Sequence, residues 1–491
     1  MLLPVVLLGL SLLCEASPVP LKVAVVGGGP GGSSAAFWLS LAKQRAPAGT
    51  SIDITVFEQE SRVGGRSTTT HPYDDPSYPP IELGASIFAS SNRNMMRAAS
   101  EFNLELAHFG GATPGIGVWD GTQFVWQSTN NDTADNISMA DRYKDGPVIS
   151  GELVDKFSSS FAKSYDPSLP QFHSISAYSQ TLGYDALSTV ILKSYFQQNG
   201  VNERWIDEFM TGSVRFNYLQ DISAINGVGG LTSLAAGAAY GVKSGNYRIF
   251  EEFVKRSKAN LKLQTKVLSI TKLSTSTTPY LVVTNKGSYR FDAVIIAVPL
   301  PVANIAFINL PQPMFFPKVN YVQLHVTIVS TTTPAVLPAY FKGKPSDVLP
   351  GTILTTAEYG TQPEFHSFRY TDEIKRNGHT EYIVKIFSKA EITDTTLNTL
   401  FGQGGIGWRL RKVWNAYPYF PQRSEYPPIK LAKGLYYVNA MEALLSTMET
   451  ETISSRNVVD LLTKEMLNSG ICGPNGPKGP MTDSYALGWD C

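Results

Sequence analysis

The chain has 491 residues, more than one hydrophobic core usually holds, so we expect two or more domains. Lysine plus arginine and aspartate plus glutamate both total 41, so the formal net charge is zero. Because the basic residues are also not clustered, the sequence argues against a polyanion-binding protein and indicates no nucleic-acid partner. The six histidines are scattered without metal-ligand spacing, and we predict no metal site.

The N-terminal segment has the pattern of a secretory signal peptide. Residues 2–13 are apolar, and residues 14–16 place small side chains where a cleavage site needs them. A buried first strand is the alternative, but Pro4 and the prolines at 18 and 20 disfavour it. We therefore predict a signal peptide over 1–17 and a protein of the secretory pathway, in a lysosome or vacuole or outside the cell.

The first strand–turn–helix carries the clearest motif. Residues 22–26 are an apolar run typical of a buried parallel strand, and Gly27, Gly29 and Gly32 follow with G-x-G-x-x-G spacing, enclosing Pro30-Gly31. Such glycines form a tight turn, let a diphosphate touch the backbone and bring the helix close to the strand. The free N–H groups of the helix start then face the phosphates. The motif indicates a dinucleotide cofactor; an ordinary strand-to-helix turn is the alternative.

The second predicted strand, residues 52–57, ends in Glu58. An acidic residue at the tip of this strand accepts hydrogen bonds from the ribose of a dinucleotide. Glu58 stands further beyond Gly32 than the usual spacing of about 20 residues. The polar, Pro/Gly-containing residues 44–51 supply a loop that absorbs the difference. Glu58 therefore strengthens the dinucleotide interpretation.

The rest of the chain alternates between helical and strand patterns. Residues 91–229 are mostly helical by pattern, residues 247–300 return to strands, and residues 301–430 are rich in strands and proline. After Asp292, residues 293–298 are continuously apolar, as expected of a central parallel strand. The uncharged stretch 222–242 is rich in glycine, alanine and serine, which indicates a buried segment and no transmembrane span.

We therefore predict an α/β protein, with a discontinuous Rossmann-like cofactor domain and an inserted mixed α+β substrate domain. The predicted divisions are the cofactor-domain segments 20–90, 230–300 and 431–470, the helical part 91–229 and strand-rich part 301–430 of the substrate domain, and a Gly/Pro-rich tail 471–491.

Two sequons and a pair of cysteines suit a secretory route. Asn131 and Asn136 each begin an N-x-S/T sequon in a polar, loop-like stretch, and we predict both as glycosylation sites. Cys472 and Cys491 bracket the Gly/Pro-rich tail, whereas Cys14 leaves with the signal peptide. One disulfide in an oxidising compartment and two unpaired thiols are both open.

Two further motifs resemble FAD-binding elements of the amine oxidase and GDP-dissociation-inhibitor fold group. Glu58 is followed by Gly64-Gly65-Arg66, and then by Gly84-Ala85-Ser86. The resemblance implies that the first motif passes the diphosphate and the second passes the flavin ring. Small residues let the backbone approach a flat cofactor, and the Arg66 guanidinium offers fixed donors to phosphate.

Later elements agree with this resemblance. Val267 lies in a strand similar to the one whose valine backbone holds the adenine. Glu442, Met448 and Glu449 stand where the fold group closes on the ribityl chain and the flavin ring. Amides at a helix start there would stabilise the anionic reduced ring. The resemblance therefore implies FAD as the cofactor.

Within this fold group the chain resembles the prenylcysteine oxidase (farnesylcysteine lyase) family. The similar blocks are residues 214–226, 384–388, 414–419 and 435–449, and with the N-terminal motifs they extend over nearly the whole mature chain. The segment from Cys472 to Cys491 departs from the family pattern, as does the long loop at 71–80.

The resemblance implies an oxidoreductase that cleaves S-farnesyl- or S-geranylgeranyl-L-cysteine. Carbon 1 of the prenyl group gives a hydride to flavin N5, water adds, and a prenyl aldehyde and free cysteine are released. Dioxygen then reoxidises the flavin and yields hydrogen peroxide. The protein supplies orientation and a dry apolar slot, and peripheral contact with a membrane is compatible with such a substrate.

Three residues in the similar blocks are candidates for catalysis or substrate binding. Arg215 either holds the substrate carboxylate bidentately or forms a structural ion pair with Asp221. Lys385 either lies near flavin N5 through a water or is a solvated strand lysine. Tyr417 either walls the flavin pocket or is an ordinary core tyrosine.

Two other functions stay open from the sequence. An amine or polyamine oxidase would use the same fold, but it needs an amine-recognising aromatic pair that the sequence does not locate. A non-enzymatic prenyl-binding carrier of the GDP-dissociation-inhibitor type would not need flavin. The intact Glu58 and Gly64-Gly65-Arg66 favour bound FAD over the carrier.

Overall fold

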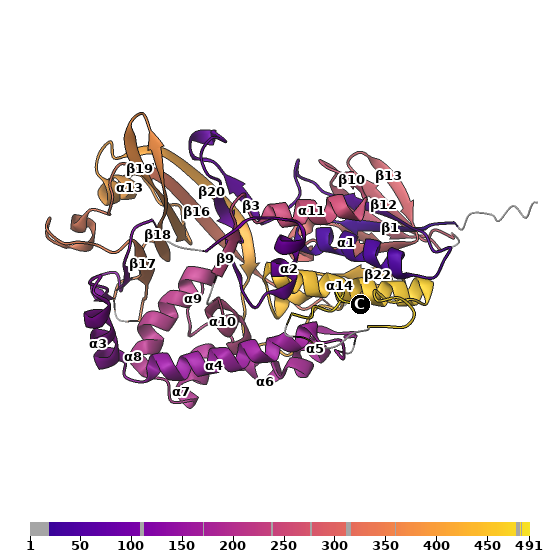
Figure 1. The fold of residues 1–491 in the computed structure, drawn as a ribbon, viewed down its shortest axis with the longest axis horizontal. Helices are drawn as coiled ribbons and strands as arrows, with labels where there is room; N and C mark the ends of the chain where they lie inside the picture. The colour runs from indigo at the N-terminus through magenta and orange to yellow at the C-terminus, as the bar shows by residue number, and fades with distance from the viewer. Residues whose placement is uncertain are drawn as a thin grey trace, which may run out of the picture.

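The computed structural model describes residues 19–108, 112–169, 171–236, 239–274, 277–310, 316–358, 360–477, 482 and 484–491. The predicted signal peptide and Cys14 therefore lie outside the described residues. Two sheet-bearing parts lie side by side, and a row of helices that includes α4, α5 and α6 runs along one side of both (Figure 1).

The cofactor domain is built on a six-stranded sheet in the order β10-β2-β1-β14-β22-β21. The first five strands are parallel, and β21 pairs antiparallel with β22. Segments far apart in the chain supply this sheet, which confirms the predicted α/β class with a Rossmann-like domain. The strands are Asn260–Lys262 (β10), Ile52–Phe57 (β2), Leu21–Val26 (β1), Ala293–Ile296 (β14), Leu435–Tyr437 (β22) and Lys430–Ala432 (β21).

Strand β14 is buried along its whole length between β1 and β22, so the prediction of a central parallel strand is confirmed. Such a strand carries apolar side chains on both faces because both sides of its sheet are covered. Beside it lies a second sheet in the order β13-β12-β11-β15. Its strands are Gly287–Phe291 (β13), Tyr280–Thr284 (β12), Val267–Lys272 (β11) and Ala306–Ile308 (β15), and the short helix α12 spans Leu300–Ala303.

Helix α1 (Pro30–Arg45) starts directly after the glycine-rich turn and packs against α11 (Tyr247–Ser257) and α14 (Met448–Leu467). The sequence pattern predicts a helix near 457–462, but this helix begins about two and a half turns earlier, at Met448. The reason is a capping box: the Thr447 side chain accepts from the Thr450 N–H, and Thr450 bonds back to the Thr447 backbone. Helix α14 therefore points its N-terminus toward the middle of the molecule.

The substrate domain contains a seven-stranded sheet in the order β20-β16-β19-β18-β17-β7-β8. One face is covered by α13 (Asp394–Phe401) and the 3-10 turn Pro338–Phe341, which together close an aromatic core. The opposite face is turned toward the cofactor domain. The strands are Ile406–Pro418 (β20), Tyr321–Thr331 (β16), His379–Ser388 (β19), Ser367–Arg376 (β18), Thr352–Thr355 (β17), Ile116–Trp119 (β7) and Phe124–Gln127 (β8).

The region predicted as helical, 91–229, differs from that prediction at its start. Strands β7 and β8 complete the substrate sheet, and β6 (Leu106–His108) pairs with β9 (Ala239–Val242). These strands are short, and pairing of β7 with β17 and of β6 with β9 joins them to strands elsewhere in the chain. The other small strands are Phe88–Ala89 (β5), which pairs with β9, and the pair Thr68–Thr70 (β3) and Ile81–Gly84 (β4).

Helices fill most of this region. They are α2 (Arg93–Glu101), α3 (Asp132–Tyr143), α4 (Gly146–Phe161), α5 (Ile175–Leu182), α6 (Asp185–Ser188), α7 (Leu192–Gln198), α8 (Glu203–Trp205), α9 (Thr211–Tyr218) and α10 (Gly227–Leu234). Helix α10 belongs to the uncharged stretch and is largely buried. In the part of the chain that the structure describes, no helix has the length and apolar character needed to cross a bilayer.

Both predicted glycosylation sites are exposed on α3. Asn131 caps the helix by accepting from the Ala134 N–H at 3.2 Å, whereas Asn136 lies inside the helix, so the predicted loop is wrong there. At the other end of the chain, a disulfide joins Cys472 to Cys491, and the Trp489 ring packs against Phe37. The tail is therefore docked on α1.

Candidate functional site

A cleft of about 680 Å³ lies between the cofactor domain and the exposed face of the seven-stranded sheet. Its walls come from the glycine-rich loops, the first turn of α14, the strands β16, β18, β19 and β20, and the helices α4, α9 and α10. The predicted cofactor residues that line it are Gly27, Gly29, Pro30, Gly31, Glu58, Gly65, Arg66, Gly84, Ala85, Ser86, Val267, Met448 and Glu449. Gly32, Gly64 and Glu442 lie behind this lining.

The two glycine loops meet backbone to backbone at one end of the cleft. Gly27 has a φ of 103°, a left-handed value that favours glycine and turns the chain into α1. A Cβ on Gly65 would approach the Gly29 Cα at 3.1 Å, and the Gly64 N–H donates to the Gly28 carbonyl at 2.8 Å. A Cβ on Gly32 would collide with the Gly27 carbonyl, so Gly32 serves helix packing behind the loop.

Glu58 is buried at the tip of β2, where it organises the first loop. Its Oε2 accepts from the Gly28 N–H at 2.7 Å, and its Oε1 accepts from the Glu60 N–H at 2.8 Å. Burial raises the pKa of Glu58, while these two backbone donors oppose that shift. Each carboxylate oxygen keeps a second lone pair, so the predicted contact with a ribose is compatible with the geometry.

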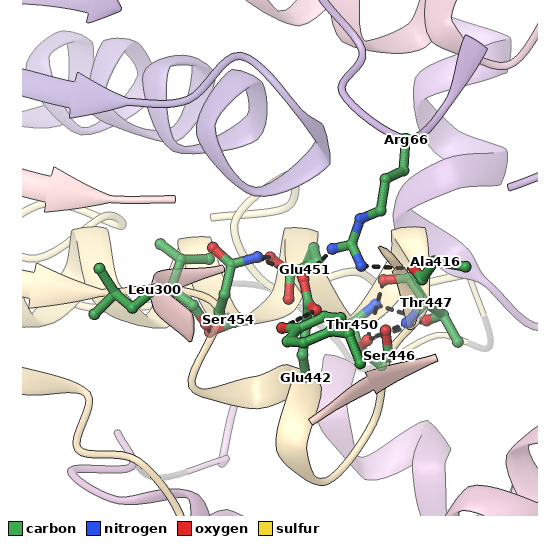
Figure 2. Close-up of polar contacts among 12 residues, drawn as sticks. Arg66, Leu300, Ala416, Glu442, Ser446, Thr447, Thr450, Glu451 and Ser454 are labelled. Atoms are coloured by element: carbon green, nitrogen blue, oxygen red, sulfur yellow. Dashed lines mark hydrogen bonds and ion pairs between the residues drawn. The ribbon is translucent and has the colours of Figure 1, made fainter. Parts of the chain in front are cut away.

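Arg66 reaches into the polar group of Figure 2 from one edge and connects both domains. Its Nη1 donates to the Ala416 carbonyl of β20 at 2.7 Å, and its Nη2 pairs with the Glu442 carboxylate. The Tyr321 hydroxyl of β16 donates to the other Glu442 oxygen at 2.7 Å. Two of the five guanidinium N–H groups are thus engaged by protein, and the predicted contact of Arg66 with phosphate stays a prediction for the remaining donors. Glu442 positions Arg66 and does not face the cleft.

The start of α14 brings two more carboxylates to this end of the cleft. Glu449 accepts from the Asn94 and Met95 N–H groups of α2, both at 2.9 Å, and from the Tyr165 hydroxyl at 2.6 Å. Burial raises the pKa of Glu449 to about 7. These bonds cap the N-terminus of α2, so the Glu449 carboxylate is largely used within the protein, although the residue also lines the cleft. Glu451 also lines the cleft, and sequence analysis does not identify it.

The predicted flavin-side motif, Gly84 to Ser86, lies beside the substrate sheet. A Cβ on Gly84 would collide with the Trp414 ring of β20, so only glycine fits there. Lys385 of β19 donates to the Ser86 hydroxyl at 2.9 Å and to the Glu82 carbonyl at 2.6 Å. Burial lowers the pKa of Lys385 to about 8 and raises that of Glu82 to about 8. Lys385 therefore lines the cleft, and its pKa is lower than that of an ordinary lysine.

Tyr417 also lines the cleft, with its ring set edge-on against Tyr218 at a centroid distance of 5.0 Å. Burial raises the pKa of its hydroxyl. Arg215 does not line the cleft, so its predicted role with substrate is wrong. It is 0 % exposed, donates to the Thr355 hydroxyl at 3.0 Å and pairs with Asp221 at 2.7 Å. This is the structural ion pair that the sequence leaves open.

The substrate sheet turns a cationic face to the cleft. Arg369 of β18 and Lys385 of β19 are directly opposite each other in the ladder, and both line the cleft with the exposed Lys412 of β20. The helical side of the cleft is apolar, with Phe157 and Phe161 of α4 among its lining residues, together with Phe216 of α9. Sequence analysis misses Arg369 because alternation in β18 shows two faces without showing which one meets the cleft.

These residues fit FAD. Where the glycine loops meet, the cleft wall is bare backbone at the N-terminus of α1, which suits a diphosphate. Along the cleft, the Tyr417 hydroxyl, the Trp414 Nε1 and the Glu451 Oε1 are buried without a hydrogen-bond partner among the described residues. Buried polar atoms of this kind normally bond to a ligand or water. Within the described ranges, no cluster of His, Cys, Asp and Glu has the arrangement of a metal site.

Comparison with known proteins gives two family matches. A model of the prenylcysteine lyase family matches residues 127–470, and a model of an NAD(P)-binding Rossmann-like domain matches residues 25–102. Farnesylcysteine lyase of Arabidopsis thaliana is 27% identical over 480 residues, which cover 92% of this chain and 90% of that protein. Prenylcysteine oxidase 1 of Homo sapiens is 28% identical over 470 residues, covering 89% and 88%.

Among solved structures, a double mutant of putrescine oxidase matches with a TM-score of 0.57 at 13% identity, covering 91% of this chain and 100% of that one. Cyclohexylamine oxidase from Brevibacterium oxydans matches with a TM-score of 0.56 at 14% identity and the same coverage. At this level of identity the likeness shows a shared fold.

We expect Glu442→Ala to destabilise the protein, because it leaves the Arg66 guanidinium without its buried counter-charge. Removing one partner of a buried pair costs about 3–5 kcal/mol, which urea unfolding followed by circular dichroism would measure. A matched control is Glu105→Ala, which breaks the exposed pair with Lys243 and should hardly change stability. Equal losses in the two variants would contradict the central role of the Arg66–Glu442 pair.

Proposed function

The chain belongs to the prenylcysteine lyase family and is an FAD-dependent oxidoreductase, and we propose that it cleaves S-prenyl-L-cysteine at the thioether. One observation carries this proposal: a single cleft joins a dinucleotide cradle to an aromatic, apolar wall and a cationic sheet face. A prenylcysteine has an apolar chain at one end and a charged amino acid at the other, and this cleft offers a surface for each.

The chain's own residues would hold FAD as follows. Glu58 would accept from the ribose, the Gly29 to Gly31 backbone would face the diphosphate, and Gly84 to Ser86 would pass the ring system. When bound, FAD supplies the two-electron acceptor for hydride removal from the carbon next to sulfur. Arg66 pairs with Glu442 and so holds the Gly64-Gly65-Arg66 loop in place.

The apolar wall orients the substrate and excludes water. Phe157, Phe161 and Phe216 come from two helices and face the same cleft as the substrate sheet. Burying a prenyl chain against them yields roughly 25 cal/mol per Å² of apolar surface removed from water. That energy places the carbon next to sulfur at the cofactor, which is how remote binding supports the chemical step.

The cationic face would receive the substrate's carboxylate. Arg369 and Lys385 are cross-strand neighbours, so their positive charges lie close together at the cleft wall. A carboxylate is the anion that an arginine binds with paired, directional hydrogen bonds. Lys385, whose Nζ already bonds to Ser86, would at the same time hold the flavin-side loop in place. Tyr417 would close the wall beside it.

We also propose dioxygen as the final electron acceptor and the secretory pathway as the location, in a lysosome or vacuole or outside the cell. The apolar N-terminal pattern over 1–17, the exposed sequons on α3 and the Cys472–Cys491 disulfide support that route. Because the substrate is amphipathic, peripheral contact with a membrane surface is part of the same proposal.

Incubating the purified holoenzyme with S-farnesyl-L-cysteine in air should give hydrogen peroxide, farnesal and cysteine in equal amounts. Spermine should give no peroxide, because a polycation meets the cationic face formed by Arg369, Lys385 and Lys412. Peroxide, aldehyde and thiol assays measure the three products. Turnover of spermine in place of farnesylcysteine would favour an amine oxidase, and a colourless protein without FAD would favour a prenyl carrier.

Arg369→Gln should raise KM for farnesylcysteine about ten- to a hundredfold, since one hydrogen bond between charged groups is lost. FAD content should stay unchanged, which flavin absorbance verifies. Lys412→Gln, at the exposed edge of the same face, is the matched control and should have a small effect. If the variant lowers activity on the free acid and on its methyl ester equally, Arg369 does not bind the carboxylate.

Expression in a eukaryotic secretory host should yield a protein that lacks residues 1–17 and carries N-glycans. Intact-mass spectrometry before and after glycosidase treatment tests both points. The control is a double variant, Asn131→Gln with Asn136→Gln, which should show no mass change on treatment. An unglycosylated wild-type protein that keeps its N-terminus would contradict the proposed location.

A further inference from the structure

Glu451 is a buried acid at the cofactor cleft whose role the proposed function leaves unexplained. It lies in the first turn of α14, is 4 % exposed and contributes to the cleft lining. Its Oε2 accepts from the Asn439 Nδ2 at 2.9 Å. Its Oε1 is buried and has no hydrogen-bond partner among the residues that the structure describes. A buried polar atom left in this way is costly unless a ligand or water completes it.

The charges around Glu451 leave it without a counter-ion of its own. Asn439 also donates to Glu442 at 2.6 Å, so one amide bridges two carboxylates. Among the described residues, the cation that acts on Glu451 is Arg66, and it pairs with Glu442. The titratable and charged groups that act on Glu451 from the neighbouring elements are Glu442, Arg66 and Tyr437, and the Tyr321 hydroxyl bonds to Glu442 beside them. Burial first, and the Glu442 charge second, raise the pKa of Glu451 well above its ordinary value.

The position of Glu451 identifies what it can reach. A Cβ on Gly31 would lie 2.7 Å from the Glu451 Oε2, so the carboxyl group lies directly against the first turn of α1. That turn is the anion-binding end of the helix, where the diphosphate of a dinucleotide is held. An ionised carboxylate there would repel the phosphates, whereas a neutral carboxylic acid has an O–H to give them.

We propose that Glu451 is a neutral carboxylic acid that donates a hydrogen bond from Oε1 to a phosphate oxygen of bound FAD. FAD binding is then linked to a proton: ionisation of Glu451 removes the donor and places a negative charge beside the phosphates. The sign follows directly. Cofactor retention is full while Glu451 is protonated and falls as the pH rises through its pKa in the holoenzyme.

The inference rests on the FAD cofactor and needs no statement about the substrate. The experiment therefore uses holoenzyme without substrate and measures FAD release by the rise in flavin fluorescence from pH 6 to pH 10. A protein purified without FAD would refute the proposed function, whereas release kinetics test Glu451 alone. Because burial shifts the pKa of Lys385 and that of Glu82 to about 8, within the range scanned, only differences between variants are interpreted.

Two variants separate the donor from the charge. Glu451→Gln keeps a neutral donor of the same size, and we expect slow FAD release with little dependence on pH. Glu451→Ala removes the donor, and we expect release about ten- to a hundredfold faster at low pH, the range for one hydrogen bond to a charged acceptor. Wild-type release should match Glu451→Gln at low pH and approach or exceed Glu451→Ala at high pH.

Four outcomes would overturn the proposal. Retention of FAD by Glu451→Ala as in the wild type would show that no bond is made. Equal loosening of both variants would show that Glu451 only supports Asn439. Parallel pH profiles for the wild type and Glu451→Gln would remove the proton linkage. The ³¹P spectrum of bound FAD should shift with pH in the wild type and not in the variants. A spectrum that stays constant with pH would show that Glu451 does not contact a phosphate and would refute that assignment.

Discussion

The buried pair between Arg66 and Glu442 is the interaction on which the architecture of the cleft depends. Arg66 leaves the cofactor domain, Ala416 belongs to the substrate sheet, and Glu442 lies beside the last cofactor-domain strand. One guanidinium therefore fixes the relative position of segments that are hundreds of residues apart in the chain. A planar guanidinium can bond to two acceptors at once, which suits arginine to joining two segments. A charge removed from water is costly without a counter-charge, so a carboxylate has to lie opposite it.

The same pair sets the electrostatics of its surroundings. Since Arg66 is committed to Glu442, the second carboxylate that Asn439 bridges has no cation to balance it. Burial then favours its neutral form. Two chemically identical side chains a short distance apart thus have different surroundings, because Glu442 pairs with Arg66 and Glu451 does not. A cofactor site that must accept a diphosphate benefits from a neutral donor in that position more than from another charge.

Features with a local physical signature can be predicted from the sequence, and features that depend on distant partners cannot. Gly27 and the all-apolar β14 reveal themselves through spacing and composition, because a tight turn and a doubly covered strand demand those residues. The role of Arg215 could not be decided from the sequence, because an arginine in a buried ion pair and an arginine that binds a carboxylate ligand have the same sequence pattern. Glu451 gives no signal at all: its role arises from Gly31, which is remote in sequence and adjacent in space.

The division of labour between the domains explains how one fold serves different substrates. The glycine loops, Glu58 and the start of α14 define a cofactor cradle, and the amine oxidases of similar fold show that such a scaffold is not tied to one substrate. Here the exposed face of the substrate sheet carries Arg369 and Lys385. That face repels a diamine and attracts a carboxylate, while α4 and α9 contribute aromatic rings for an apolar chain. Specificity therefore lies in the inserted domain.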